Sequence, residues 1–213
     1  MTLELNEVSQ VFYFSSIPVV LPENAIYSRL GRNRFLNKLP DAQKILLEKY
    51  IEEGIALCKP QGCWTRLNIV ERTPDSVTLE NGSILHSARL AEMLSASHAV
   101  LLTAATAAAG IVEAAGAAAE AGEGVKALVY DAAGSEISDG AIGWIHEYTA
   151  QLFRRGGERL TARRFSPGYG DLGLENQKII FDILKLDKLG VRLNESLIMI
   201  PEKSVTAISG IEK

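Results

Sequence analysis

Apolar residues recur at helical intervals through the stretch that begins at Asp41. They are Ile45, Leu46, Tyr50, Ile51, Ile55 and Leu57. This spacing predicts a helix that Asp41 caps and that ends before Pro60. The first forty residues contain three prolines in a mixed apolar and polar pattern, which predicts only short strands and turns there.

Strand-like alternation of apolar and polar residues follows. It covers residues 63–71 and 76–86, and the second run is interrupted by Asn81-Gly82. That dipeptide favours a tight hairpin turn, so we expect a small antiparallel meander. Ser87 is a suitable cap for a short helix over 88–97.

The middle of the chain alternates a buried strand with two helices. Residues 98–106 form an apolar run typical of a buried strand, and the alanine-rich residues 107–124 predict a closely packed helix. A long helix is expected over 125–153, ended by Gly156-Gly157. Its apolar side comprises Val129, Ala133, Ile137, Ile142, Ile145 and Tyr148.

The last quarter predicts strands around one further helix. Residues 158–165 have a strand-like pattern, 174–184 form an amphipathic helix with acids near its start, and 193–201 and 203–211 are β-branched runs separated by Pro201. Strands and helices in this mixed order predict an α+β fold. We expect one domain over residues 1–213, with a twisted, largely antiparallel sheet flanked by helices.

Composition narrows the classes of partner. The chain is 47% hydrophobic and 23% charged, with a formal net charge of −4. This composition predicts a folded chain. The sequence has no dense run of basic residues that would bind nucleic acid or anionic lipid. The N-terminal acids do not resemble a signal peptide, and residues 99–112 are too short and alanine-rich to span a membrane. We expect a cytoplasmic protein.

Neither the cysteines nor the histidines predict a metal site. Cys58 and Cys63 are the only two cysteines, and two thiols without further ligands favour a structural role over zinc or a disulfide. His86, His98 and His146 are isolated, and His146 is interpreted as a helix-surface residue. The site prediction therefore contains no metal ligand.

A glycine motif at Gly122-x-Gly124-x-x-Ala127 superficially fits the dinucleotide-binding fingerprint. That fingerprint requires a strand before the glycines, whereas an alanine-rich helix precedes them here, so a turn between helices is expected. No nucleophile elbow or phosphate-binding Walker loop is present, and no catalytic residue is assigned. The pattern favours binding, or methyl-group chemistry carried by a cofactor.

One stretch carries a specific resemblance. Arg164-x-x-Pro167-Gly168-Tyr169, followed by a helix and then by "LGVRLNESLIMIPEKSVTAISG", resembles the activation domain of cobalamin-dependent methionine synthase. The family positions after the helix are filled by Gly190, Val191, Leu193, Glu195, Ser196, Pro201, Ser204 and Val205. The resemblance is strongest over 125–210, and Asp139 stands where the family's preceding helix usually carries glutamate.

The resemblance implies a site for S-adenosylmethionine. Arg164 can hold the carboxylate of the ligand through a two-pronged charged hydrogen bond. The backbone from Ser166 through Pro167 to Gly168 can face the nucleoside, and Tyr169 offers a flat face near the sulfonium or adenosyl group. Asp139 can neutralise the ammonium or bind the ribose hydroxyls.

The resemblance also implies a role in the reactivation of cobalamin. The expected partner is a separate cobalamin-binding methionine synthase that lacks its own activation domain, with flavodoxin or another one-electron reductant as electron donor. The alternatives are reactivation of another corrinoid methyltransferase and a non-catalytic module that binds S-adenosylmethionine or a corrinoid protein. The chain departs from the family at the end of the closing strand, where Ser209 stands near a family tyrosine.

Overall fold

A computed structural model describes residues 10–20, 23–31 and 39–213. The helices are α1 (Glu23–Arg29), α3 (Asp41–Leu57), α4 (Ala88–Met93), α5 (Ala109–Glu120), α6 (Gly124–Arg155), α7 (Asn176–Leu184) and the short 3-10 helix η1 (Leu186–Leu189). The strands are β1 (Phe12–Phe14), β2 (Gln61–Arg72), β3 (Ser76–Leu79), β4 (Ile84–His86), β5 (Ala99–Thr106), β6 (Arg159–Leu160), β7 (Arg192–Leu193), β8 (Met199–Ile200) and β9 (Ser204–Glu212).

The main sheet is antiparallel throughout the described residues. Its strand order is β4-β3-β2-β5-β9-β6, and β1 pairs with β2 outside this order. The central strand β5 pairs along its whole length with β2 on one side and β9 on the other, and all of its residues are buried. These pairings confirm the predicted α+β fold with a largely antiparallel sheet.

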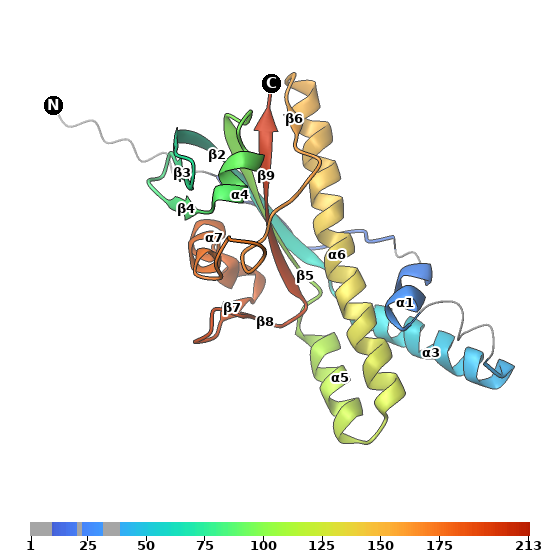
Figure 1. Ribbon diagram of the computed structural model, residues 1–213. Coiled ribbons are helices and arrows are strands. Elements are labelled where there is room, and N and C mark those ends of the chain that lie inside the picture. Colours follow the sequence, from blue (N-terminus) through green and yellow to red (C-terminus); the bar gives the residue numbers. More distant parts are fainter. Residues whose placement is uncertain (1–9, 21–22, 32–38) are drawn as a thin grey trace.

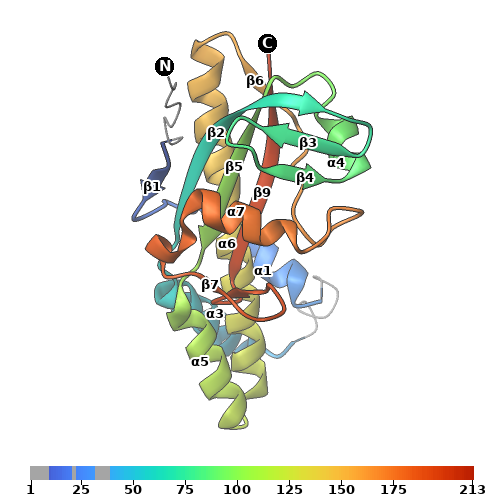
Figure 2. The same cartoon turned by 90° about the vertical axis from the view of Figure 1, so that its left-hand side faces the viewer.

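Helices cover both faces of the sheet. On one face α6 runs along β9 and β5, as Figure 1 shows, and its Ile142 and Ile145 join Leu101 and Ile211 in a buried cluster. On the other face lie α4 and α7, and α7 crosses the strands in Figure 2. The core there includes Leu67, Leu102, Leu90, Ile180 and Ile208. Alternate residues of each strand therefore serve two separate cores.

Gly62 lets α6 and the N-terminal segment approach the sheet closely. A Cβ atom at Gly62 would lie 2.5 Å from the Ala104 carbonyl oxygen and 2.6 Å from Cδ1 of Ile145. The side chain of Ile17 lies in the same place, at 3.2 Å. Since real Cβ atoms do not approach backbone oxygen so closely, this position requires glycine.

The helix that begins at Asp41 is confirmed, but its cap differs from the prediction. Pro40 occupies the N-cap position without a side-chain hydrogen bond, and Asp41 is the first helical residue. Of the apolar residues used to predict the helix, Ile51 is buried and Ile45 is 66% exposed. The buried residues of the helix are Leu47, Ile51 and Gly54. Spacings of four and three residues place these three on one side of the helix. That side packs against Val129 and Ala133 of α6.

Two predicted strands near the C-terminus are shorter than expected. The run 158–165 contains only β6 and an isolated bridge from Phe165 to Ile208. The run 193–201 is not one strand, because Asn194 accepts hydrogen bonds from the N–H groups of Ser196 and Ile198 and turns the chain back. The result is the small β7–β8 hairpin.

The other predicted elements agree more closely with the structure. The Asn81-Gly82 turn joins β3 to β4, with Gly82 at a φ of 82°. Ser87 caps α4 by accepting the Leu90 N–H at 2.9 Å, although this helix ends at Met93. The predicted end of α6 is also confirmed, with Gly156 at its C-cap.

The N-terminal forty residues contain a helix that the sequence did not predict. The prediction of only strands and turns before Asp41 was wrong for α1, and residues 1–9, 21–22 and 32–38 lie outside the described residues. The run 99–112 divides between β5 and α5, and α5 buries only Ile111 and Ala118. Within the described ranges, no helix combines the length and apolarity needed to cross a membrane.

Candidate functional site

The loop that carries the Arg-x-x-Pro-Gly-Tyr motif is fixed to the closing strand β9. The Phe165 N–H donates to the Ile208 carbonyl at 2.9 Å, and the Ile208 N–H donates back at 2.7 Å. The hydroxyl of Ser166 donates to the Thr206 carbonyl at 2.6 Å. In Figure 1 this loop crosses β9 from the α6 side of the sheet to the α7 side. The motif is therefore held against the middle of the long strand β9.

A concavity of about 350 Å³ lies between this loop, α6 and β9, and we call it the α6–β9 concavity. It is lined by Asp139, Ile142, Arg164, Phe165, Ser166, Tyr169, Val205 and Ala207. Four of the six predicted site residues are brought together here, although Asp139 and Arg164 are 25 positions apart in the sequence. Pro167 and Gly168 do not line it, and Pro167 is buried beneath the loop.

Arg164 supplies a positive charge without a partner. Its side chain is exposed, and none of the residues that the structure describes forms an ion pair or hydrogen bond with its guanidinium. Burial lowers the pKa of His146, and the nearby charge of Arg164 lowers it further. His146 lies on α6 one turn after Ile142, so the imidazole beside the concavity is favoured in its neutral form.

Asp139 is already engaged by a residue that the sequence did not point to. Arg29 of α1 donates from Nη2 to Oδ2 of Asp139 at 3.1 Å and from Nε to Oε1 of Glu136 at 2.6 Å. The hydrogen bond with Glu136 raises the pKa of Arg29. The predicted ligand carboxylate is therefore part of a three-residue charge cluster at the edge of the concavity.

Backbone N–H groups of the Pro-Gly-Tyr turn form hydrogen bonds within the loop itself. The Gly168 N–H donates to the Leu172 carbonyl at 2.8 Å, and the Tyr169 N–H donates to the Ser166 carbonyl at 3.2 Å. Gly168 has a φ of 87°, in the left-handed region that favours glycine. Tyr169 is 70% exposed. The N–H groups of Gly168 and Tyr169 thus close the turn, while the phenol ring is presented at the rim.

Ser209 lies deeper on the same face of β9. Odd-numbered residues of this strand face α6, and Ser209 follows Val205 and Ala207 along it. Its side chain is only 1% exposed, and its Oγ has no hydrogen-bond partner among the described residues. The Nε2 atom of His146 is likewise buried without a partner. The resemblance implies a tyrosine near this position, and the structure has the buried hydroxyl of Ser209 there.

Comparison with known proteins gives a structural match. No protein-family model matches the chain, and no curated protein matches it. Among solved structures it is similar to the crystal structure of the MetH reactivation domain bound to AdoHcy, with a TM-score of 0.67. The fold is that of the MetH reactivation domain. The match covers 96% of this chain and 79% of that one, at 12% sequence identity.

The structural match establishes the fold, and any binding chemistry has to be argued from the residues of the concavity. At 12% identity the likeness establishes the shared layers and topology. The roles of Arg164, Ser166, Tyr169 and Asp139 remain predictions that rest on their position in one concavity. Arg29 and His146 were not assigned to the site from sequence. Arg29 falls in a segment without recognisable motifs, and His146 has a spacing that signals only a helix.

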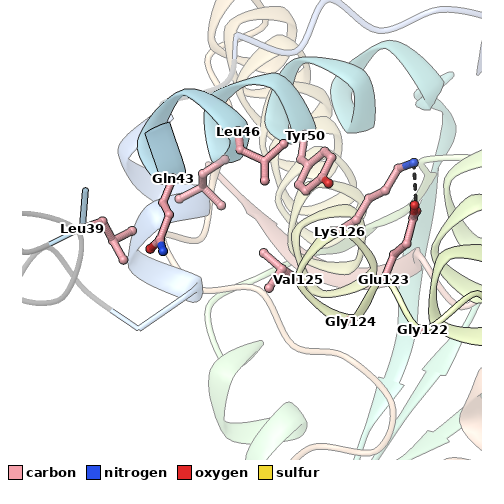
Figure 3. Close-up of a pocket in the computed structure, with 10 residues that line it drawn as sticks. Leu39, Gln43, Leu46, Tyr50, Gly122, Glu123, Gly124, Val125 and Lys126 are labelled. Atoms are coloured by element: carbon pink, nitrogen blue, oxygen red, sulfur yellow. Dashed lines mark ion pairs between the residues drawn. The ribbon is translucent and has the colours of Figure 1, made fainter. Parts of the chain in front are cut away.

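A second, more apolar concavity lies far from the motif, between α3 and the start of α6 (Figure 3). Leu46, Tyr50 and Val125 line it, and Lys126 pairs with Glu123 at 3.1 Å. Gly122 and Gly124 lie here, in the turn between α5 and α6. This is the predicted turn between helices, so the fingerprint geometry of strand, glycines and helix is not formed.

The other histidines and cysteines of the described residues do not gather into a metal site. His98 Nε2 lies 2.8 Å from Oε1 of Glu158, beside Arg66. Burial raises the pKa of both Cys58 and Cys63 to about 12, which makes them poor thiolates and favours the structural role. Within the described part of the chain, no group of three or more His, Cys, Asp and Glu side chains could hold a metal ion.

Proposed function

We propose that this protein binds S-adenosylmethionine in the α6–β9 concavity and presents it to a cobalamin protein whose cobalt has been oxidised. The observation that carries the proposal is the joint position of Arg164, Tyr169 and Asp139 around one concavity. The fold is shared with a reactivation domain that was crystallised with AdoHcy. AdoHcy is S-adenosylmethionine without its transferable methyl group, so the same kind of site suits both.

The lining residues fit the parts of this ligand. The unpaired guanidinium of Arg164 matches the carboxylate, and Asp139 offers a carboxylate to the ammonium. Ile142, Val205 and Ala207 form an apolar wall against which adenine can lie. The exposed ring of Tyr169 at the rim can cover the sulfonium, because a cation is attracted to an aromatic face.

Reactivation divides the chemistry between ligand, partner and electron donor. S-adenosylmethionine supplies the methyl group and leaves as AdoHcy, and a one-electron reductant such as flavodoxin supplies the electron that cob(II)alamin needs to accept that methyl. This chain holds the ligand in place and orients it toward the partner. The partner is a cobalamin-binding methionine synthase without its own activation domain.

Calorimetric titration with S-adenosylmethionine tests the binding step. We expect saturable binding and a rise in the thermal unfolding midpoint, because a ligand that binds only the folded state stabilises it. If about millimolar ligand produces no heat and no thermal shift, the proposal is wrong. Such a result means that the binding free energy is weaker than about −4 kcal/mol.

A reconstituted reaction tests the second step. Cob(II)alamin methionine synthase truncated before its activation domain is mixed with reductant and S-adenosylmethionine, with and without this protein. Faster appearance of methylcobalamin with the protein supports reactivation. An unchanged rate despite ligand binding would reject that role.

Two other functions compete with this one because the buried Ser209 stands on β9 near the position where the resemblance implies a tyrosine. The protein can serve another corrinoid methyltransferase, or it can be a non-catalytic module that binds S-adenosylmethionine or a corrinoid protein. Substituting a different corrinoid protein in the reconstituted reaction distinguishes the first alternative. Ligand binding without methyl transfer to any corrinoid protein supports the second.

A further inference from the structure

A third concavity lies on the other side of the Arg-x-x-Pro-Gly-Tyr loop, against α4. It has a volume of about 580 Å³, and we call it the arginine concavity. It is lined by Arg89, Glu92, Met93, Arg163, Arg164 and Phe165. Three guanidinium groups from two separate elements, α4 and the loop, thus surround one space. Arg164 lines this concavity and the α6–β9 concavity alike.

The charges of this concavity are not balanced within the protein. Glu92 is the single acid in its lining, against three arginines. Within the described ranges, none of the three guanidinium groups forms an ion pair or a side-chain hydrogen bond, although Arg29 and Arg159 do so elsewhere. The chain as a whole has a net charge of −4. Like charges gathered in a hollow repel one another, and a bound anion removes that repulsion.

The two walls are fixed to each other. Asp171, just after the motif, accepts hydrogen bonds from the Ser87 hydroxyl at 2.5 Å and from the Arg89 N–H at 3.1 Å. The Ser87 hydrogen bond lowers the pKa of Asp171, so this carboxylate stays charged in neutral solution. A Cβ atom at Gly170 would lie 3.1 Å from the Phe165 ring and 3.2 Å from Nη1 of Arg89. Arg89 therefore lies directly against the loop.

The chemistry of the lining selects the class of ligand. Guanidinium groups bind phosphate through paired N–H donors, and a phosphate monoester offers three acceptor oxygens to several of them at once. Phe165 and Met93 add an apolar wall that a free inorganic ion would leave unused. We propose that the arginine concavity binds an organic phosphate monoester, with the phosphate on the arginines and an apolar group over Phe165 and Met93.

Arg164 couples this site to the one under Proposed function, on which this step rests. A guanidinium that turns toward a phosphate is removed from the carboxylate of S-adenosylmethionine. The phosphate ligand therefore lowers the affinity for S-adenosylmethionine, and by linkage S-adenosylmethionine lowers the affinity for the phosphate ligand by the same factor.

Phenyl phosphate is a suitable probe, because it combines a phosphate with one aromatic ring. Binding is followed by calorimetry and by NMR shifts of α4 and loop amides, with inorganic phosphate and benzoate as comparisons. Phenyl phosphate should bind most tightly and benzoate most weakly. Equal binding of benzoate would overturn the assignment to phosphate.

Variants locate the site without touching the α6–β9 concavity. Arg89→Ala and Arg163→Ala should each weaken phenyl phosphate binding at least about tenfold, while Arg192→Ala, an exposed arginine that lines neither concavity, should not. Arg89→Ala should leave S-adenosylmethionine binding unchanged in phosphate-free buffer. If both variants fold and still bind phenyl phosphate with the affinity of the wild type, the assignment of the ligand to the arginine concavity is wrong.

The two proposals fail separately. If S-adenosylmethionine does not bind, the phenyl phosphate titration still decides the arginine concavity. If both bind, saturating phenyl phosphate should weaken S-adenosylmethionine binding, and an unchanged affinity would overturn the shared use of Arg164.

Discussion

The guanidinium of Arg29 on α1 lies 3.1 Å from the carboxylate of Asp139 on α6, at the rim of the α6–β9 concavity. The N-terminal segment reaches this point by crossing α6 at Gly140, where a Cβ atom would lie 2.6 Å from Cγ1 of Val19. A ligand ammonium that pairs with Asp139 therefore meets a competing cation.

Arg29→Ala should tighten S-adenosylmethionine binding, and Asp139→Asn should weaken it. The gain in Arg29→Ala should be at most about fivefold, since an exposed ion pair is worth about 0.2–1 kcal/mol. Calorimetry at low and high salt measures both variants, and the gain should shrink at high salt. Weaker binding in Arg29→Ala would show instead that Arg29 holds Asp139 in the binding orientation.

Arg164→Ala should weaken S-adenosylmethionine binding at least about tenfold, because the variant loses a charged hydrogen bond worth about 1.5–3 kcal/mol. Arg192→Ala is the matched control, since Arg192 is exposed on β7 and lines neither concavity. Arg163 is a poorer control. Alternation along a strand would place it on the face opposite Arg164, but no strand forms there, and both residues line the arginine concavity. A change below about threefold in Arg164→Ala would remove Arg164 from the site.

Arg164→Ala should also raise the pKa of His146. Burial and the charge of Arg164 hold this pKa below the ordinary value of 6.5, so stability from the neutral imidazole is complete above about pH 6.5 and is lost as pH falls through the folded-state pKa. Without Arg164 the folded-state pKa moves toward 6.5, and the loss in acid becomes smaller. NMR titration of the imidazole protons measures the pKa, and an unchanged value would contradict an electrostatic effect of Arg164 on His146.

Gly168→Ala should lower the free energy of unfolding by about 1–2 kcal/mol, because its φ of 87° places an alanine in the left-handed region. A Cβ atom there would meet only Leu174, at 3.5 Å, so the cost is conformational. Gly143→Ala in α6 is the control. It has nothing within 4 Å and should raise the free energy of unfolding by about 0.5–1 kcal/mol. Urea denaturation compares the two, and equal effects would contradict the turn geometry.

Ser209→Ala should raise the free energy of unfolding by about 1 kcal/mol, since it removes a buried hydroxyl that has no partner among the described residues. Ser166→Ala should lower it by about 1 kcal/mol, because it loses the hydrogen bond to Thr206. Both substitutions remove one oxygen, so they are matched in size. Destabilisation in Ser209→Ala would indicate a bound water at that hydroxyl.

The elements that sequence predicted well are those whose signals are local. The buried strand β5, the Asn81-Gly82 turn and the Ser87 cap each depend on a few adjacent residues. The Arg164-to-Tyr169 motif is likewise a continuous stretch, so its candidate chemistry could be predicted from residue types. The spacing on α3 predicted the helix but not its buried side, because packing against α6 decides which apolar residues are covered: Ile51 is buried and Ile45 is exposed.

The amino-acid sequence by itself thus determined the order of most strands and helices, although not α1 or the β7–β8 hairpin, together with the α+β class and a candidate binding loop. Tertiary structure decided which charges meet. Arg29 and Asp139 are 110 positions apart, and Arg89 lies near Arg163 and Arg164 where Asp171 ties α4 to the loop. Contacts of this kind depend on how the sheet and its helices pack. No spacing along the chain encodes them, because each element's local pattern is compatible with many neighbours.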